Sequence, residues 1–152
     1  MIPPPNTDHA LMDSEHRAVL DWAQEGAKRL REARPTEESL YAVNVLVHLA
    51  RSHFEHEQVE MRERGYPDWV VHRQDHERLL AELAQLRQSV VEEAGGARSA
   101  ARRPPHERLA VWMHAHIARH DRRYAKWLRQ HGPNPAGAVK PTWSAHDSRP
   151  SG

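Results

Sequence analysis

The chain has 152 residues, enough for one helical domain with a sizeable core but too few for two. Its 22 Lys and Arg residues nearly balance its 21 Asp and Glu residues, which argues against nucleic acid or an anionic membrane surface as the partner. Because the sequence contains no cysteine, it excludes disulfides, thiolate metal sites and cysteine-held iron–sulfur clusters. Its 13 histidines are the one unusual number in the composition. They indicate either metal binding or surface histidines without a specific role.

The first residues have no targeting signal, and no later stretch has the composition of a membrane span. Residues 1–12 lack the basic start and apolar run of a signal peptide, and no run of about 18 apolar residues occurs anywhere. We therefore expect a cytoplasmic protein without a membrane partner. Residues 1–12 include three consecutive prolines and are expected to form an arm ahead of a domain at residues 13–131.

Four helical segments are predicted from apolar side chains that recur every three or four residues, with breaks rich in Pro and Gly between them. The predicted helices span residues 14–33, 37–64, 68–93 and 104–131. Asp13 or Ser14 is expected to cap the first helix and Thr36 the second, while Asp68 caps the third. Helices of this length predict an all-α, up-down-up-down antiparallel four-helix bundle. The Pro-, Gly- and Ser-rich residues 132–152 are expected to be disordered.

Each predicted helix carries a histidine or a carboxylate on its apolar, inward face. His53 and Glu57 are four residues apart in the second helix, a spacing that brings two side chains onto the same side of a helix. His72 and His76 repeat this spacing in the third helix, where Val71 is also assigned to the inward face. The sequence therefore predicts two pairs of polar side chains that point into the core.

Buried imidazoles and carboxylates indicate a metal site, although a lone His16 on the first helix would be more typical of a hydrogen-bonded core residue. Burying several such groups costs several kcal/mol unless something neutralises and coordinates them, and a metal ion does both. Ligands of this kind without sulfur suit iron, manganese or zinc. A structural zinc ion is satisfied by about four ligands, so a larger set indicates two ions.

The motifs resemble the ligand signature of the hemerythrin family. The resemblance covers about residues 12–128 and places all seven ligand positions in order, together with Met61 and Tyr66-Pro67. The seven positions are His16, the HFxxE of His53 and Glu57, the HxxxH of His72 and His76, and the HIxxxD of His116 and Asp121. The resemblance implies a di-iron site in the core of the bundle, with two iron ions joined by an oxo or hydroxo bridge.

The resemblance also implies how the seven ligands are shared between the two irons. One iron would take His72, His76 and His116, and the other would take His16 and His53. Glu57 and Asp121 would bridge the two ions. This set fills all but one of the positions of two octahedra, and the open position on the two-histidine iron is the expected binding place of dioxygen.

Four apolar residues are similar to those that line the oxygen pocket in the family: Phe54, Trp112, Met113 and Ile117. Apolar walls at this place would slow oxidation of the iron pair, although ordinary core packing explains the same residues equally well. The chain departs from the family at Gln58, where many members carry a second acid. The arm, the basic segment 97–103 and the residues after 132 have no counterpart in the family.

In the fourth helix, regular geometry and the resemblance favour different residues. On a straight helix His120 lies about 40° from His116, whereas Asp121 lies about 140° away, so geometry alone favours His120. The HIxxxD pattern favours Asp121, and a second carboxylate would also neutralise charge that another imidazole would not. A π-type turn between His116 and Asp121 would bring the carboxylate inward, and we therefore expect irregular hydrogen bonding there.

The leading hypothesis is reversible dioxygen binding for storage, delivery or sensing at a non-heme di-iron centre, with no catalytic residue assigned. An enzyme that reduces peroxide, nitric oxide or oxygen needs the same ligands. A third hypothesis is a module that reports oxygen or redox state to an unknown protein partner through the arm or the tail. The sequence does not discriminate between a carrier and a catalyst.

Overall fold

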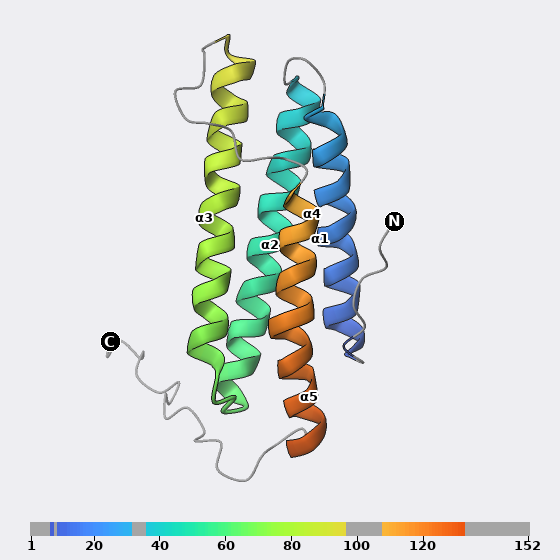
Figure 1. Cartoon of the computed structure of the whole chain (residues 1–152), viewed down its shortest axis with the longest axis vertical. Coiled ribbons are helices and arrows are strands. Elements are labelled where there is room, and N and C mark those ends of the chain that lie inside the picture. Colours follow the sequence, from blue (N-terminus) through green and yellow to red (C-terminus); the bar gives the residue numbers. More distant parts are fainter. Residues whose placement is uncertain (1–6, 8, 32–35, 97–107, 133–152) are drawn as a thin grey trace, which may run out of the picture.

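The structure, a computed structural model, describes residues 7, 9–31, 36–96 and 108–132. Over these residues the chain is all-helical, with four helical segments that lie side by side along the long axis of the molecule (Figure 1). The elements are α1 (Ala10–Arg29), α2 (Glu37–Glu63), α3 (Trp69–Ala94), α4 (Arg108–His116), the π-helix η1 (Ile117–Asp121) and α5 (Arg122–His131). The last three follow one another without a break and form the fourth segment. Helix α1 packs against α2 and α4, and α2 packs against α3, which makes a helical bundle.

Helix α1 begins earlier than the sequence predicts. It starts at Ala10, where the His9 side chain caps it by accepting a hydrogen bond from the Met12 backbone N–H at 3.3 Å. Asp13, one of the two predicted caps, lies in the first turn and accepts from the backbone N–H and the hydroxyl of Thr7. The expectation of an arm over residues 1–12 is therefore wrong for residues 10–12, which are helical.

The other helix ends agree with the prediction more closely. The Thr36 side chain caps α2 and forms a capping box with Ser39. Gly65 follows the end of α2 with φ 72°, a left-handed conformation that glycine adopts without strain. Asp68 precedes α3, but its side chain makes no capping hydrogen bond.

Some sequence-based expectations fall on residues that the structure does not describe. These include the end of the first helix at residues 32–33, the basic segment 97–103 and the start of the fourth helix at residues 104–107. The tail expected at residues 132–152 lies outside the described residues from 133 onward. Over the described residues, no helix is long and apolar enough to cross a membrane.

The core consists of two apolar clusters with a layer of buried polar side chains between them. The main apolar cluster is formed by Val19, Leu20, Ala23, Leu30, Val43, Leu46, Ala50, Phe54, Leu79, Leu83, Leu86, Val90, Met113 and Ile117. The aromatic end cluster is formed by Met12, Met61, Tyr66 and Tyr124, with Trp69, Trp127 and Leu128 packed against it. On α1, for example, His16 lies between Met12 of the aromatic end cluster and Val19 of the main apolar cluster.

Val71 does not belong to the inward face of α3. Its side chain is 56% exposed, while the adjacent His72 is buried. Successive residues on a helix point about 100° apart, so a neighbour of an inward residue turns toward solvent. The inward face of α3 in this region is polar, and it leads into the buried layer.

Candidate metal centre

Seven buried side chains from all four helical segments bring nitrogen and oxygen atoms together in the polar layer. They are His16 on α1, His53 and Glu57 on α2, His72 and His76 on α3, His116 at the end of α4, and Asp121 at the end of η1. Each of the seven is at most 2% exposed. They form two groups, in each of which one donor atom per residue lies within 4.8 Å of all the others. Glu57 and Asp121 belong to both groups, which therefore adjoin one another.

The position of Asp121 depends on a π-helix. The π-type turn expected from the sequence is present at Ile117–Asp121, and the wider turn lets a residue five positions after His116 return to the same side. Asp121 is fully buried as a result. His120 remains partly exposed and lies 3.7 Å from Asp75, outside the two groups of donor atoms that share Asp121.

Three histidine nitrogens converge on one side of the layer. The Nε2 atom of His116 lies 3.0 Å from that of His76 and 3.3 Å from that of His72. Asp121 Oδ1 lies 2.8 Å from His72 Nε2 and 2.9 Å from His116 Nε2. Two ligands bound at right angles to one ion, at about 2.1 Å each, lie about 3.0 Å apart. These separations are therefore those expected of donor atoms around a single ion.

The second side of the layer has two histidines. His16 Nε2 lies 2.8 Å from Asp121 Oδ2, and His53 Nε2 lies 4.0 Å from the same oxygen. The two oxygens of Asp121 thus face different histidines. Glu57 Oε2 lies 3.6 Å from His53 Nε2 and 3.3 Å from His76 Nε2, between the two sides.

Many of these buried atoms have no hydrogen-bond partner. Both oxygens of Glu57 and Asp121 and both ring nitrogens of His16 are in this state, although His16 and His72 each approach Asp121 to 2.8 Å. Buried polar atoms without partners cost several kcal/mol, and native proteins rarely retain several in one place. A metal ion would satisfy these lone pairs together. The residues present therefore fit a metal ion bound by imidazole and carboxylate.

Carboxylates outside the layer orient two of the histidines. His53 Nδ1 lies 3.0 Å from Glu15, whose other oxygen lies 2.7 Å from His56 Nδ1. His116 Nδ1 lies 2.7 Å from Asp75. An acceptor at Nδ1 places the proton there and leaves the Nε2 lone pair facing inward, as is usual for metal-binding histidines.

Gln58 lies beside a third histidine. Its side-chain amide nitrogen Nε2, a donor and not an acceptor, lies 3.1 Å from His76 Nδ1. Sequence reasoning noted Gln58 only as a departure from an acidic position, and it did not identify Glu15 or Asp75 as partners of histidines. The one signal was that Glu15 and Asp75 each precede an inward histidine in the chain, but each contacts a different histidine about 40 residues away.

Electrostatics in the metal-free layer favour ionised carboxylates and protonated histidines. Burial lowers the pKa of His53, but the negative charges of Glu57, Asp121 and Glu15 outweigh it and raise the pKa to about 10. Burial is likewise outweighed at His116, where Asp121 and Asp75 raise the pKa to about 9. Neighbouring histidines hold the pKa values of Glu57 and Asp121 below their usual range despite burial.

His76 differs from these two histidines. Burial lowers its pKa to about 4, with the charge on His116 acting in the same direction against the attraction of Glu57. His76 is therefore neutral at physiological pH, which is the form that coordinates a metal ion. Binding at His53 or His116 would first displace protons.

The four expected pocket residues lie in or against the main apolar cluster. The Phe54 ring stacks on the His76 ring with centroids 3.9 Å apart and lies 5.4 Å from the His116 ring. Met113 and Ile117 are buried in the same cluster, and Trp112 is half-buried against it. The Phe54 ring also lies 5.6 Å from the His53 ring, so the apolar wall adjoins the three-histidine side and reaches the two-histidine side through Phe54.

The site belongs to the class of buried histidine–carboxylate clusters in helical bundles, with donor atoms at metal-binding distances. Comparisons with protein-family models, with curated proteins and with solved structures found no match for this chain. What the protein does is therefore inferred from the chemistry of the cluster itself.

Proposed function

We propose that this protein binds dioxygen reversibly, for storage, delivery or sensing, at a carboxylate-bridged di-iron centre in a hemerythrin-like, up-down-up-down bundle. One observation carries the proposal: Glu57 and Asp121 are shared by two adjoining groups of buried donor atoms, with three histidines on one side and two on the other. A mononuclear structural ion needs no such shared carboxylates.

The seven residues would coordinate both iron ions and leave one coordination position free. His72, His76 and His116 would hold one iron, and His16 and His53 the other, with both carboxylates between them. The two-histidine side has one protein ligand fewer, so it offers a place for a small molecule. The iron pair, when bound, would supply the electrons that dioxygen takes up on binding and returns on release.

Nitrogen and carboxylate ligands without sulfur suit iron or manganese, and two carboxylates offset much of the charge of two divalent ions. The apolar wall at Phe54, Met113 and Ile117 supports binding rather than turnover, because it keeps water and protons from the centre. Reversible binding requires that the irons are not oxidised permanently by solvent-assisted steps.

The test is metal analysis of the purified protein followed by an oxygen cycle. We expect two irons per chain, and after anaerobic reduction a visible spectrum that appears with oxygen and disappears on deoxygenation, with an oxygen-isotope-sensitive resonance Raman band. His72→Ala should lose iron, whereas His48→Ala, at an exposed position of α2, should not.

Three outcomes would contradict the proposal. They are stoichiometric zinc in the purified protein, two irons with an unaltered spectrum in His72→Ala, or a reduced protein whose visible spectrum does not change when oxygen is added. Rapid multiple turnover with peroxide or nitric oxide, without a stable oxygen complex, would instead identify an enzyme that uses the same cluster.

A further inference from the structure

A pocket lies between the second half of α1 and the first turns of α2, with a cavity volume of about 550 Å³. This size is in the range of small-molecule sites. Its lining includes none of the seven residues of the metal cluster. The pocket lies about six residues beyond His16 on α1 and about twelve before His53 on α2, which corresponds to about 9 and 18 Å along the helices.

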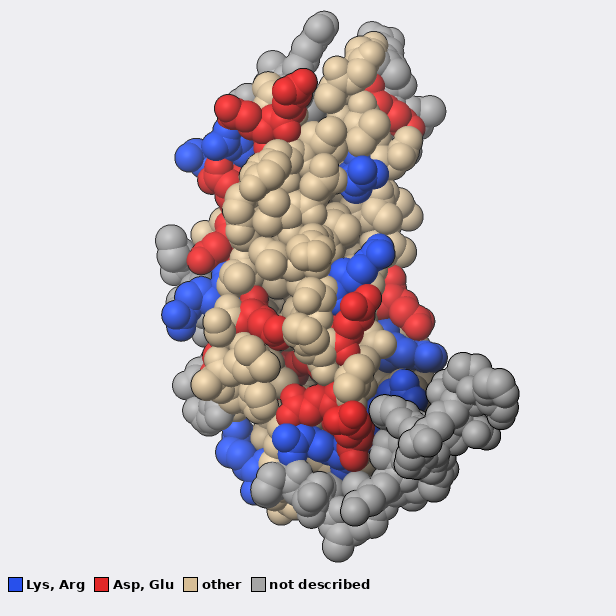
Figure 2. All heavy atoms as spheres, turned by 180° about the vertical axis from the view of Figure 1, so that it is seen from behind, with Lys and Arg blue, Asp and Glu red and all other residues tan. Residues whose placement is uncertain are grey.

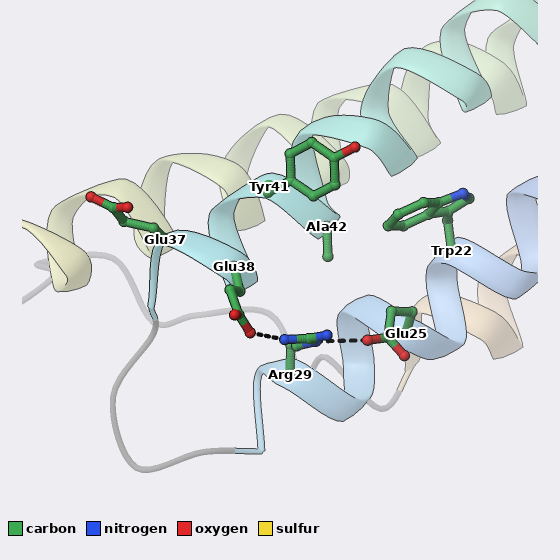
Figure 3. Close-up of a pocket in the computed structure, with 7 residues that line it drawn as sticks. All are labelled: Trp22, Glu25, Arg29, Glu37, Glu38, Tyr41 and Ala42. Carbon is green, nitrogen blue, oxygen red and sulfur yellow. Dashed lines mark hydrogen bonds and ion pairs between the residues drawn. The ribbon is translucent and has the colours of Figure 1, made fainter.

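Two aromatic rings form one side of this pocket. Figure 3 shows Trp22 of α1 and Tyr41 of α2 next to each other along one side of the hollow, near Ala42, with the ion pairs of Arg29 on the other side. The ring centroids of Trp22 and Tyr41 are 6.0 Å apart, and the planes are inclined at 73°. Tyr41 is 63% exposed, so its face remains available to a ligand.

The charged residues at the pocket are predominantly acidic. Glu25, Glu37 and Glu38 contribute three carboxylates, and Arg29 contributes one guanidinium. Arg29 is already engaged, since it donates to Glu25 at 2.6 Å and to Glu38 (Figure 3). The Glu37 carboxylate is directed away from Trp22 and Tyr41 (Figure 3). Lys28 of α1 attracts Glu25 from outside the lining. Glu25 and Glu38 against Arg29 leave the lining at the hollow with one negative charge in excess.

The neighbouring residues of α2 contribute no positive charge that would offset the negative charge of the pocket. Residues 39–50 of α2 contain no Lys, Arg, Asp or Glu. Figure 2 shows a broad uncharged area in the upper half of one face of the molecule, with acidic side chains at its upper edge and basic side chains beside them. An apolar hollow with aromatic walls and an acidic edge is complementary to a ligand that is both apolar and positively charged.

We infer that this pocket binds a small organic cation with an apolar body, such as an aryl- or alkylammonium compound. The cationic group would lie against the exposed face of Tyr41, beside Trp22 and near the carboxylates of Glu25 and Glu38, while the apolar part would lie on Ala42. Aromatic faces attract cations through their quadrupole, and carboxylates add attraction for positive charge. An anion of the same shape would meet the excess negative charge. The site is separate from the proposed iron centre and does not depend on it.

The experiment titrates the purified 152-residue chain with three probes of similar shape. These are benzyltrimethylammonium, neutral benzyl alcohol and anionic phenylmethanesulfonate. Binding is measured by calorimetry and by the changes in backbone amide chemical shifts in NMR. We expect saturable binding of the ammonium probe, at least about 10-fold tighter than either other probe. The shifted amides should be confined to the second half of α1 and the first turns of α2.

Variants then test the walls and the charge separately. Tyr41→Ala should weaken binding of the ammonium probe about 5-fold or more, whereas Tyr41→Phe, which keeps the ring, should not. Glu38→Gln should also weaken it, while Glu63→Gln at the other end of α2 serves as the charge control. Circular dichroism checks that each variant keeps its fold, which the exposure of Tyr41 favours.

The inference is overturned if the ammonium probe shows no saturable binding, if the neutral or anionic probe binds as tightly, or if Tyr41→Ala leaves the affinity unchanged. Shifts centred on other residues would also overturn it. None of these outcomes bears on iron content, so the two proposals fail independently.

Discussion

A buried imidazole can present either nitrogen to its surroundings, and its outer partner decides which. Asp75 performs this role for His116 and Glu15 for His53, at 2.7 and 3.0 Å. Asp75 is itself held by Arg78, which donates to it at 3.0 Å. Hydrogen bonds from His116 and Arg78, against partial burial, keep the pKa of Asp75 below its usual range, so the acceptor is ionised.

Replacing Asp75 should therefore weaken metal binding without removing a ligand. Asp75→Asn keeps the size but can turn an N–H toward His116, which disfavours the correct tautomer. We expect the metal affinity to fall about 10- to 100-fold, as found for outer partners of metal-binding histidines, when measured by competition with a chelator. Glu82→Gln is the control, because Glu82 also contacts Arg78 but, among the described residues, forms no ion pair with a histidine. Equal affinities in both variants would exclude a positioning role for Asp75.

At the residue scale, helical spacing was a good guide to inward residues and a poor one to their partners. The four-residue spacing of His53 and Glu57, and of His72 and His76, correctly predicted that these side chains share a buried layer. Contacts such as that of Glu15 with His53 join residues far apart in the chain, at the flanks of helices, where periodicity carries no information.

At the element scale, the π-helix at Ile117–Asp121 decides which residue of the fourth segment enters the cluster. It acts as one extra residue in an otherwise regular helix. Residues on both sides keep their inward faces, since Met113 before it and Tyr124 after it are both buried. Regular geometry alone would have selected His120. Residue chemistry and the family resemblance were needed to expect the irregular turn.

Deleting Ala118, an exposed residue inside η1, should convert the π-turn into regular α-helix. The carboxylate would then follow His116 by four residues and still point inward, so folding and metal uptake should largely persist. Deleting Ala115, also exposed, should instead turn His116 and Ile117 by about 100° and abolish uptake. Circular dichroism and metal analysis of both deletions provide the measurement. Equal loss of metal in both would contradict this account of the π-turn.

The start of α1 illustrates the limit of cap prediction. Asp13 and Ser14 have the side chains most often found at helix N-caps, yet His9 takes that role. The carboxylate of Asp13 is instead used by the buried Thr7, through two hydrogen bonds. Such a tertiary contact outweighs a local preference and is not visible in the spacing of residues.

At the scale of the whole molecule, charges in the metal-free layer couple stability to pH. The raised pKa values of His53 and His116 mean that their protonated forms stabilise the fold fully below about pH 6.5. This contribution is lost as pH rises through about 9 to 10. The lowered pKa values of Glu57 and Asp121 contribute in the opposite sense, since their stabilisation is lost as pH falls.

We therefore expect the metal-free protein to unfold at lower urea concentration near pH 10 than near pH 7. The metal-bound protein should not lose stability over the same range, because an ion replaces the protons and binds more tightly as they leave. Urea midpoints of both forms across this range provide the measurement. A metal-free midpoint that rises toward alkaline pH would show that the histidines are not held protonated by the carboxylates.

The polar layer between the two apolar clusters has a consequence for local unfolding. Without an ion, the aromatic end cluster is joined to the main apolar cluster through the polar layer, so we expect that end to open more readily than the rest. On metal removal, amide hydrogen exchange should accelerate most in residues 10–16 and 122–131 and least in residues 79–90. Uniform acceleration would mean one cooperative unit. In the expected case, metal binding would order one end of the bundle more than the other.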